Sequence, residues 1–152
     1  DKIVILPLLK MDITTQIHHF ILMQESAKQS DLLQLHELML TILPAGKLWL
    51  EDGKNEAGKV VTNPTIGYGN QTILLAKGKT REMFQIGISA NTAGISIYLI
   101  GIRNKMDLAR EFGAQLGKAK VTGYCIKFKQ LADLDLPVLA AAIRKGIEVT
   151  NA

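Results

Sequence analysis

Cysteine, aromatic residues and long apolar runs are scarce in this chain of 152 residues. A single cysteine, Cys125, cannot form a disulfide within the chain, which disfavours a disulfide-rich secreted protein and predicts a cytoplasmic location. Aromatic side chains make up 5% of the residues, which disfavours a surface that stacks many bases. The apolar run at residues 3–9 is too short to cross a membrane and contains Pro7. We therefore expect no membrane partner and no specific nucleic-acid motif.

What the chain does contain is typical of one globular domain. Hydrophobic residues make up 47% and charged residues 21%, and the formal net charge is +4. This mildly basic balance permits an anionic partner. We expect a single domain at residues 14–150. Residues 1–13 would form an N-terminal extension, and its segment upstream of Met11 is a candidate for non-native sequence.

The pattern of apolar residues predicts helices near both ends of the chain and strands between them. Apolar residues at helical spacing predict helices at residues 14–26, 31–43, 104–116 and 135–148. Apolar runs bounded by turn residues predict strands at residues 47–50, 65–68, 71–76, 83–89, 95–100 and 124–129. The hairpin-length links between residues 65 and 100 predict that these strands pair antiparallel in sequential order. The prediction is an α+β fold, with an antiparallel sheet of about five strands and helices packed on one face.

Capping residues set the expected helix ends. Residues 27–30 are predicted to form a loop that ends in Ser30, an N-cap for the second helix. Gly117 suits the end of the third helix, where a left-handed backbone is least costly for glycine. Asp135 and Pro137 suit the first turn of the last helix. The face of that helix expected on the sheet consists of Leu136, Leu139, Ala140 and Ile143.

Three segments carry a resemblance to a known family. They are "LGKAKVTGYCIKFKQLADLDLPVLAAAIRKGI" at residues 116–147, "PTIGYGNQTI" at 64–73 and "MFQIGISANTAGISIYLI" at 83–100. Together they resemble the YdhG-like domain family, a bacterial domain of unknown function. The resemblance implies a link to iron homeostasis, since a frataxin-like iron chaperone is among the members. The chain departs from the family pattern at residues 89–94, "SANTAG", where many relatives carry a basic turn.

Carboxylates and histidines are the residues that bear on metal binding. Asp133 and Asp135 could together hold a hard cation, but Asp135 is better interpreted as a helix cap. His18 and His19 are adjacent on a helix and point about 100° apart, and His36 lies far along the chain. No Cys/His cluster with metal-ligand spacing is present. We expect no metal site and no cofactor.

A cluster of lysines is the strongest candidate site. In "YCIKFK" the strand alternation places Cys125, Lys127 and Lys129 on one face, and Lys118 and Lys120 come from the preceding turn. These four lysines could bind an anion, or they could only protect an edge strand from aggregation. Cys125 has no histidine close in sequence, so its thiol is interpreted as packing in the fold.

The sequence leaves three functions open. The favoured one is a non-enzymatic binding or chaperone-like module that takes a small anionic ligand. A homodimer is compatible with this function. Tyr68, which two glycines flank, joins the four lysines as a candidate binding residue. The first alternative is an iron-binding chaperone of the frataxin-like type. The second alternative is a small enzyme with a pocket near Tyr68, Lys118 and Cys125.

Overall fold

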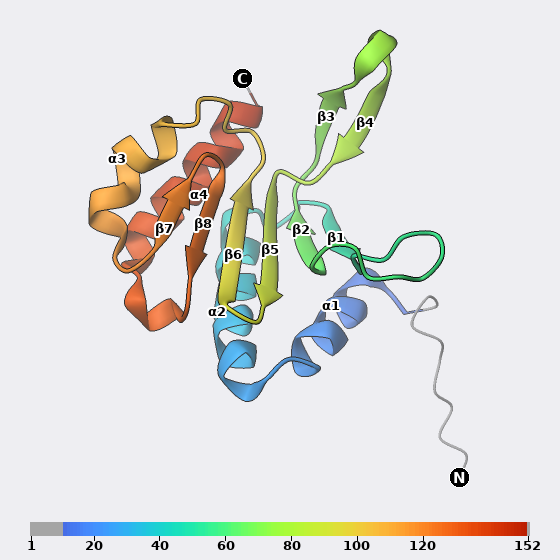
Figure 1. Cartoon of the computed structure of the whole chain (residues 1–152), viewed down its shortest axis with the longest axis horizontal. Coiled ribbons are helices and arrows are strands. Elements are labelled where there is room, and N and C mark those ends of the chain that lie inside the picture. The colour runs from blue at the N-terminus through green and yellow to red at the C-terminus, as the bar shows by residue number, and fades with distance from the viewer. Residues whose placement is uncertain (1–10, 152) are drawn as a thin grey trace.

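The computed structural model describes residues 11–151, so residues 1–10 of the predicted extension lie outside the described residues (Figure 1). The helices are α1 (Ile13–Leu22), α2 (Ser26–Ile42), α3 (Asp107–Leu116) and α4 (Leu136–Thr150), with short 3-10 turns η2 (Ala76–Gly78) and η3 (Leu131–Asp133). The strands are β1 (Leu48–Glu51), β2 (Thr65–Tyr68), β3 (Gln71–Leu74), β4 (Thr80–Met83), β5 (Ile86–Asn91), β6 (Gly94–Leu99), β7 (Lys120–Thr122) and β8 (Cys125–Phe128).

Six of these strands form one antiparallel sheet in the order β1-β2-β5-β6-β8-β7. The predicted α+β class, with an antiparallel sheet, is confirmed. The main sheet has six strands because β7 pairs with β8, where the sequence had suggested only a turn. None of the helices in the described residues is long and apolar enough to cross a membrane.

The predicted sequential pairing of strands between residues 65 and 100 holds for β5 with β6 but is wrong for the strands before them. Strand β2 pairs with β5, and β3 pairs with β4 as a separate two-stranded hairpin that projects from the body (Figure 1). The expected strand at residues 83–89 divides at Phe84 and Gln85. The side chain of Gln85 accepts a hydrogen bond from the amide of Asn70 and donates to Thr150 in α4. These contacts hold the chain where it re-enters the main sheet.

The second helix begins earlier than the sequence predicted. Ser30 lies inside α2 and is not its N-cap, and the expected loop at residues 27–30 is helical. The polar side chains there serve the junction with α1 instead. Gln29 donates to the carbonyls of Leu22 and Gln24, and Lys28 donates to the carbonyl of Asn91. These bonds satisfy carbonyls that the end of a helix and a strand leave free.

The predicted caps of the later helices are confirmed. The carboxylate of Asp135 accepts from the amide of Val138 at 3.0 Å, and Pro137 lies in the first turn of α4. Gly117 follows α3 with φ of 111°, a backbone that side chains rarely adopt. The buried face of α4 differs from the expectation, because Leu136 is 42% exposed. Its buried residues are Leu139, Ala142, Ile143, Gly146 and Ile147.

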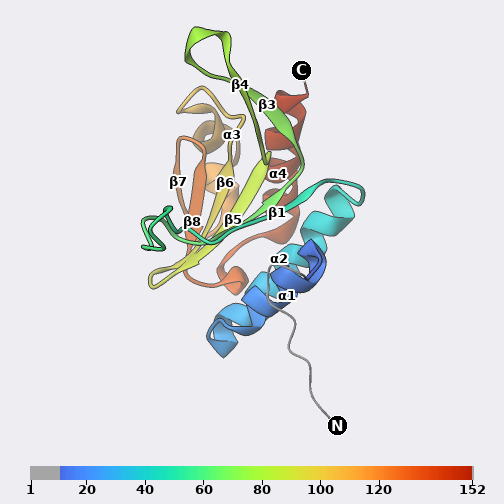
Figure 2. The same cartoon turned by 90° about the vertical axis from the view of Figure 1, so that its right-hand side faces the viewer.

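The helices leave the two faces of the sheet unlike each other. Figure 2 shows α1, α2 and α4 on one side of the sheet. The covered face contributes isoleucines from four strands to the core, namely Ile66, Ile86, Ile88, Ile95, Ile97 and Ile126. No helix in the described chain crosses the opposite face, which we call the open face. Side chains of the open face are therefore not covered by a helix of the described chain, and this face is the candidate for a ligand site.

Candidate anion-binding groove

Two neighbouring rows of side chains cross the open face. Residues directly opposite each other on paired strands share a face, so the register defines each row. The polar row, from β1 to β7, consists of Glu51, Thr65, Ser89, Ser96, Lys127 and Lys120. The aromatic row, two residues along each strand, consists of Trp49, Gly67, Gly87, Tyr98, Cys125 and Thr122. The polar row carries its positive charge at the β7 end.

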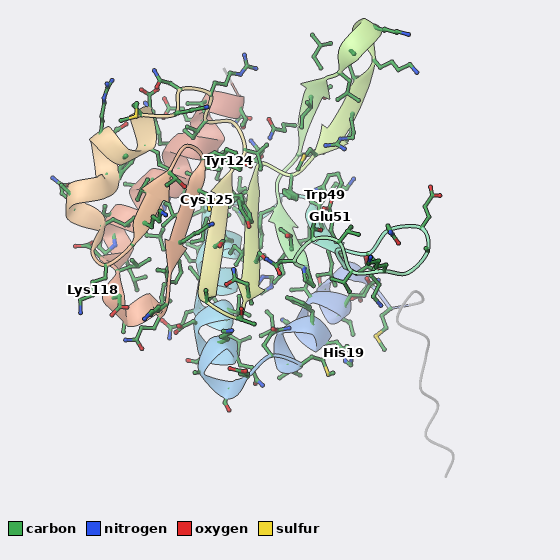
Figure 3. All side chains as sticks on the ribbon, viewed as in Figure 1. His19, Trp49, Glu51, Lys118, Tyr124 and Cys125 are labelled. Carbon is green, nitrogen blue, oxygen red and sulfur yellow. The ribbon has the colours of Figure 1, made fainter. Side chains whose placement is uncertain are left out.

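A groove of about 950 Å³ opens over this β7 end. Residues from the β1–β2 loop, the β5–β6 hairpin, the α3–β7 turn, β8 and η3 line it. They include Asn63, Asn91, Ser96, Tyr98, Lys118, Lys120, Lys127, Lys129 and Asp133. The structure therefore brings together the four lysines that the sequence singled out. Figure 3 shows Lys118 at this edge of the sheet, with Trp49 and Glu51 at the opposite edge.

Local backbone geometry positions the lysines. Gly117 turns the chain out of α3, and the next amide, of Lys118, donates to the carbonyl of Asp133 at 3.1 Å. Strand β7 then places Lys120 directly opposite Lys127 of β8. Like charges in directly opposed positions destabilise a strand pair. This pair therefore opposes folding unless counterions or a bound anion offset the repulsion.

The lysines of the groove lack protein counterions. Among residues 11–151, none of these four ammonium groups lies within 4.0 Å of a carboxylate, and the ion pair found there joins Lys145 to Glu111. Asp133 lines the groove, and its carboxylate accepts from the side-chain amide of Gln130 at 3.3 Å. The lining thus contains four cationic side chains and one acidic side chain.

The two hydroxyls of the polar row beside the groove differ in their pairing. The side-chain amide of Asn91 lies 3.4 Å from the hydroxyl of Ser96, which is 1% exposed. The neighbouring hydroxyl of Ser89 is fully buried and has no hydrogen-bond partner among the described residues. Buried hydroxyls are normally paired, so the polar row is under-satisfied next to its cationic end.

No family model, no curated protein and no solved structure matches the chain. The resemblance to the YdhG-like family therefore stays a prediction that rests on the sequence motifs alone.

The structure does not bring Tyr68 together with the lysines. Tyr68 lies on the covered face opposite Ile86, is 1% exposed, and its hydroxyl lies 2.7 Å from Nδ1 of His36. Burial raises the pKa of the Tyr68 phenol above its ordinary value. The glycines beside Tyr68 serve packing and a turn, since the ring of Phe84 lies against Gly67 on the open face.

Cys125 lies on the open face in the aromatic row but is buried. Burial raises the pKa of its thiol, and Lys127 and a hydrogen bond with Ser96 oppose that rise. A raised pKa disfavours the thiolate, which is the nucleophilic form. A pocket shared by Cys125 and Tyr68 is absent from the described residues, because the two side chains lie on opposite faces.

The histidines do not converge on a metal site. His36 is buried, with its ring centroid 5.8 Å from that of His18, and its Nε2 atom has no partner among the described residues. Burial lowers the pKa of His36, and the charge of His18 lowers it further. Within residues 11–151, no group of three or more His, Cys, Asp and Glu side chains could hold a metal ion.

Sequence reasoning missed the groove residues that come from other segments. Ser96, Tyr98 and Asn91 contribute from the β5–β6 hairpin, and Asn63 contributes from the long loop before β2. The alternation of "GISIYL" does place Ser96 and Tyr98 on one face. Their position beside Lys127 depends on the register of β6 with β8, which sequence spacing alone does not fix.

Proposed function

We propose that this protein is a non-enzymatic binding module that takes a small anionic ligand in the groove of the open face. The observation that carries the proposal is the directly opposed pair of Lys120 and Lys127 in a groove lined by two further lysines. An anion bound between these ammonium groups would remove their repulsion and gain hydrogen bonds from Ser96 and Asn91.

The charges of the four lysines set the affinity expected for a bare anion. An ion pair at an exposed site contributes about 0.2–1 kcal/mol, so four such contacts supply at most about 4 kcal/mol. That free energy corresponds to a dissociation constant near 1 mM. A physiological ligand needs further contacts, and the polar and aromatic lining residues Asn63, Asn91 and Tyr98 supply positions for them.

The proposal includes a cytoplasmic location and membership of the YdhG-like family. The single buried cysteine supports the location, because a chain of this kind does not depend on an oxidising compartment. The segment at residues 116–147 supports the membership, and it supplies all four lysines of the groove.

The iron-chaperone and enzyme alternatives have less support. Iron as a hard cation favours clustered oxygen ligands, whereas the groove is cationic. An enzyme that uses Cys125 would need an accessible thiol with a lowered pKa, and burial acts in the opposite direction.

A thermal-shift screen of small anions at low salt tests the proposal. At a ligand concentration of ten times the dissociation constant, binding adds about 1.4 kcal/mol to stability, which corresponds to a rise in Tm of several degrees. The rise should shrink between about 20 mM and 500 mM salt, because exposed charges are screened beyond a Debye length of about 8 Å at physiological ionic strength.

Two double variants distinguish binding in the groove from attraction to the overall positive charge of the protein. Lys120→Ala/Lys127→Ala should abolish the rise, whereas Lys79→Ala/Lys105→Ala removes the same charge from exposed positions outside the groove and should preserve it. Chloride at matched ionic strength corrects for salt effects. A rise that both variants lose equally, or no rise with any anion at low salt, would contradict the proposed function.

A further inference from the structure

The aromatic row and the polar row meet inside the groove. Tyr98 and Ser96 both line it, and they lie two residues apart on the open face of β6. Two residues along a strand correspond to about 6.6–6.8 Å. Lys127 is directly opposite Ser96, and Cys125 is directly opposite Tyr98. The groove therefore presents a cationic, hydroxyl-bearing region and, in the neighbouring row, an aromatic region.

The cationic region suits a phosphate group. Lys127 and Lys120 supply ammonium groups from neighbouring strands, and Ser96 adds a hydroxyl from the third strand. A phosphate dianion has several oxygen acceptors, so it can accept from both ammonium groups at once, and from the Ser96 hydroxyl in place of the bond of that hydroxyl to Cys125. Asn91 lies beside Ser96 and contributes a further amide donor. Lys118 and Lys129 line the rim and extend the positive field toward solvent.

The aromatic region suits one flat ring. Tyr98 is partly exposed in the groove, whereas Phe84 is buried against Gly67 and offers no free face. The ring of Tyr124 lies 6.2 Å from that of Tyr98, centroid to centroid, at 45°, and it is exposed beyond the groove. One accessible ring in the groove favours a ligand with a single base over a strand that stacks several bases.

From this juxtaposition we propose that the ligand is a nucleoside 5′-monophosphate, with its phosphate at Lys120, Lys127 and Ser96 and its base against Tyr98. The inference rests on the proposed function, because it names the ligand class of the same groove. The spacing of the two rows matches a molecule in which a sugar separates a phosphate from a planar base. The base adds the contact area that a bare anion lacks.

Titrations followed by amide ¹H–¹⁵N spectra test the inference in the wild-type protein. The ligands are the four common nucleoside 5′-monophosphates, ribose 5-phosphate, adenosine and inorganic phosphate, all at low salt and equal ionic strength. We expect at least one nucleotide to bind at least fivefold more tightly than ribose 5-phosphate, with the largest shifts at Ser96, Tyr98 and Lys127. A smaller ratio for every nucleotide overturns the inference.

Variants assign the phosphate and the base to their regions of the groove. In Tyr98→Leu the dissociation constant of the nucleotide should come within twofold of that of ribose 5-phosphate. Tyr98→Phe should keep the preference for the nucleotide. Lys120→Gln/Lys127→Gln should weaken the binding of the nucleotide and of ribose 5-phosphate by similar factors. Lys79→Gln/Lys105→Gln should weaken the binding of neither ligand. Should Tyr98→Leu fail to fold, the ratio of nucleotide affinity to ribose 5-phosphate affinity in the wild type and in Tyr98→Phe still tests the base contact.

The remaining outcomes distinguish the inference from the proposed function. Equal binding of ribose 5-phosphate and every nucleotide would overturn the base contact but leave an anion site in the groove. No binding of any phosphate would overturn both. Binding of a short single-stranded oligonucleotide more than tenfold tighter than the best mononucleotide would replace the inference with a nucleic-acid surface.

Discussion

The two faces of the six-stranded sheet differ in the polarity and charge of their side chains. The covered face consists of buried isoleucines in one core cluster with residues of α2 and α4. Its buried polar pair, Tyr68 and His36, is joined by a hydrogen bond, and Nε2 of His36 has no partner among the described residues. The open face carries a buried hydroxyl without a partner among the described residues, at Ser89, and two lysines in directly opposed positions. One backbone thus supports an apolar core on one side and a polar surface with opposed like charges on the other.

This difference indicates where the free energy of folding comes from and where function lies. Burial of apolar area contributes about 25 cal/mol per Å², so the covered face supplies most of the stability. Opposed like charges on the open face lower stability, and proteins retain such costs where they serve binding. Truncation of a buried side chain on the covered face should therefore lower stability, whereas removal of one opposed lysine on the open face should raise it.

The largest effect is expected on the covered face, at Leu139 of α4. This side chain is fully buried, so Leu139→Ala should lower the free energy of unfolding by about 2–5 kcal/mol through lost burial and a residual cavity. Chemical denaturation measures the change. Leu136→Ala, on the same helix but 42% exposed, is the matched control and should cost much less. Equal losses in the two variants would contradict the orientation of α4.

A steric test on the open face comes next, at Gly67 of β2. A Cβ atom there would lie 2.5 Å from a ring carbon of Phe84, which is itself buried. Gly67→Ala should therefore cost about 1–3 kcal/mol by overpacking, and it should alter the fluorescence of Trp49, whose ring centroid lies 6.2 Å from that of Phe84.

The control for Gly67 is a glycine with space around it. Gly113 lies within α3, and a Cβ atom there would meet only the Cβ of Ala109 at 3.9 Å. Gly113→Ala should raise stability by about 0.5–1 kcal/mol, since alanine is the better helix former. A loss of stability in Gly113→Ala, or none in Gly67→Ala, would show that the packing around these glycines differs from that described.

The buried histidine of the covered face predicts a pH dependence. Because burial lowers the pKa of His36 below 6.5, the unfolded chain binds this proton more readily than the folded chain. The stabilisation from neutral His36 is thus complete above pH 6.5 and is lost as the pH falls through the lower pKa of the folded state. Denaturation between pH 7.5 and pH 5 measures this loss.

Two variants identify the histidine responsible. His36→Gln should be less stable at pH 7.5 but should show a weaker decline toward pH 5. His19→Gln changes an exposed histidine and should keep the wild-type decline. A decline that is unchanged in His36→Gln would assign the effect to another group.

The sequence predicted the covered face better than the open face. Helical spacing identified the last helix, and Asp135 and Pro137 identified its start, because caps and apolar stripes act within one turn. It missed that β2 pairs with β5, since the side chain of Gln85 holds the chain at the point where the β3–β4 hairpin separates from the sheet. A contact between residues so far apart leaves no local signal.

The candidate site shows the same division. Lysines 118, 120, 127 and 129 lie within one continuous segment, so their alternation was readable from the sequence. Ser96 and Tyr98 joined them only through the register of β6 with β8. Tyr68 was expected beside the lysines, but the parity of β2 places it on the covered face. Alternation along one strand shows which side chains share a face. Which side chains of other strands lie beside them depends on how the strands pair.

The smallest effect, opposite in sign to that at Leu139, is expected at Lys120. Lys120→Gln removes one of two directly opposed ammonium groups, so it should raise the free energy of unfolding by about 0.2–1 kcal/mol at low salt. The gain should fade as salt screens the remaining charge, and Lys79→Gln, outside the groove, should not produce it. Phosphate should stabilise the wild type more than Lys120→Gln and so narrow the gap between them. Denaturation curves at two salt concentrations, with and without phosphate, measure both changes. A loss of stability in Lys120→Gln at low salt would mean that Lys120 is favourably placed without a ligand, and the contrast between the two faces would then rest on the covered face alone.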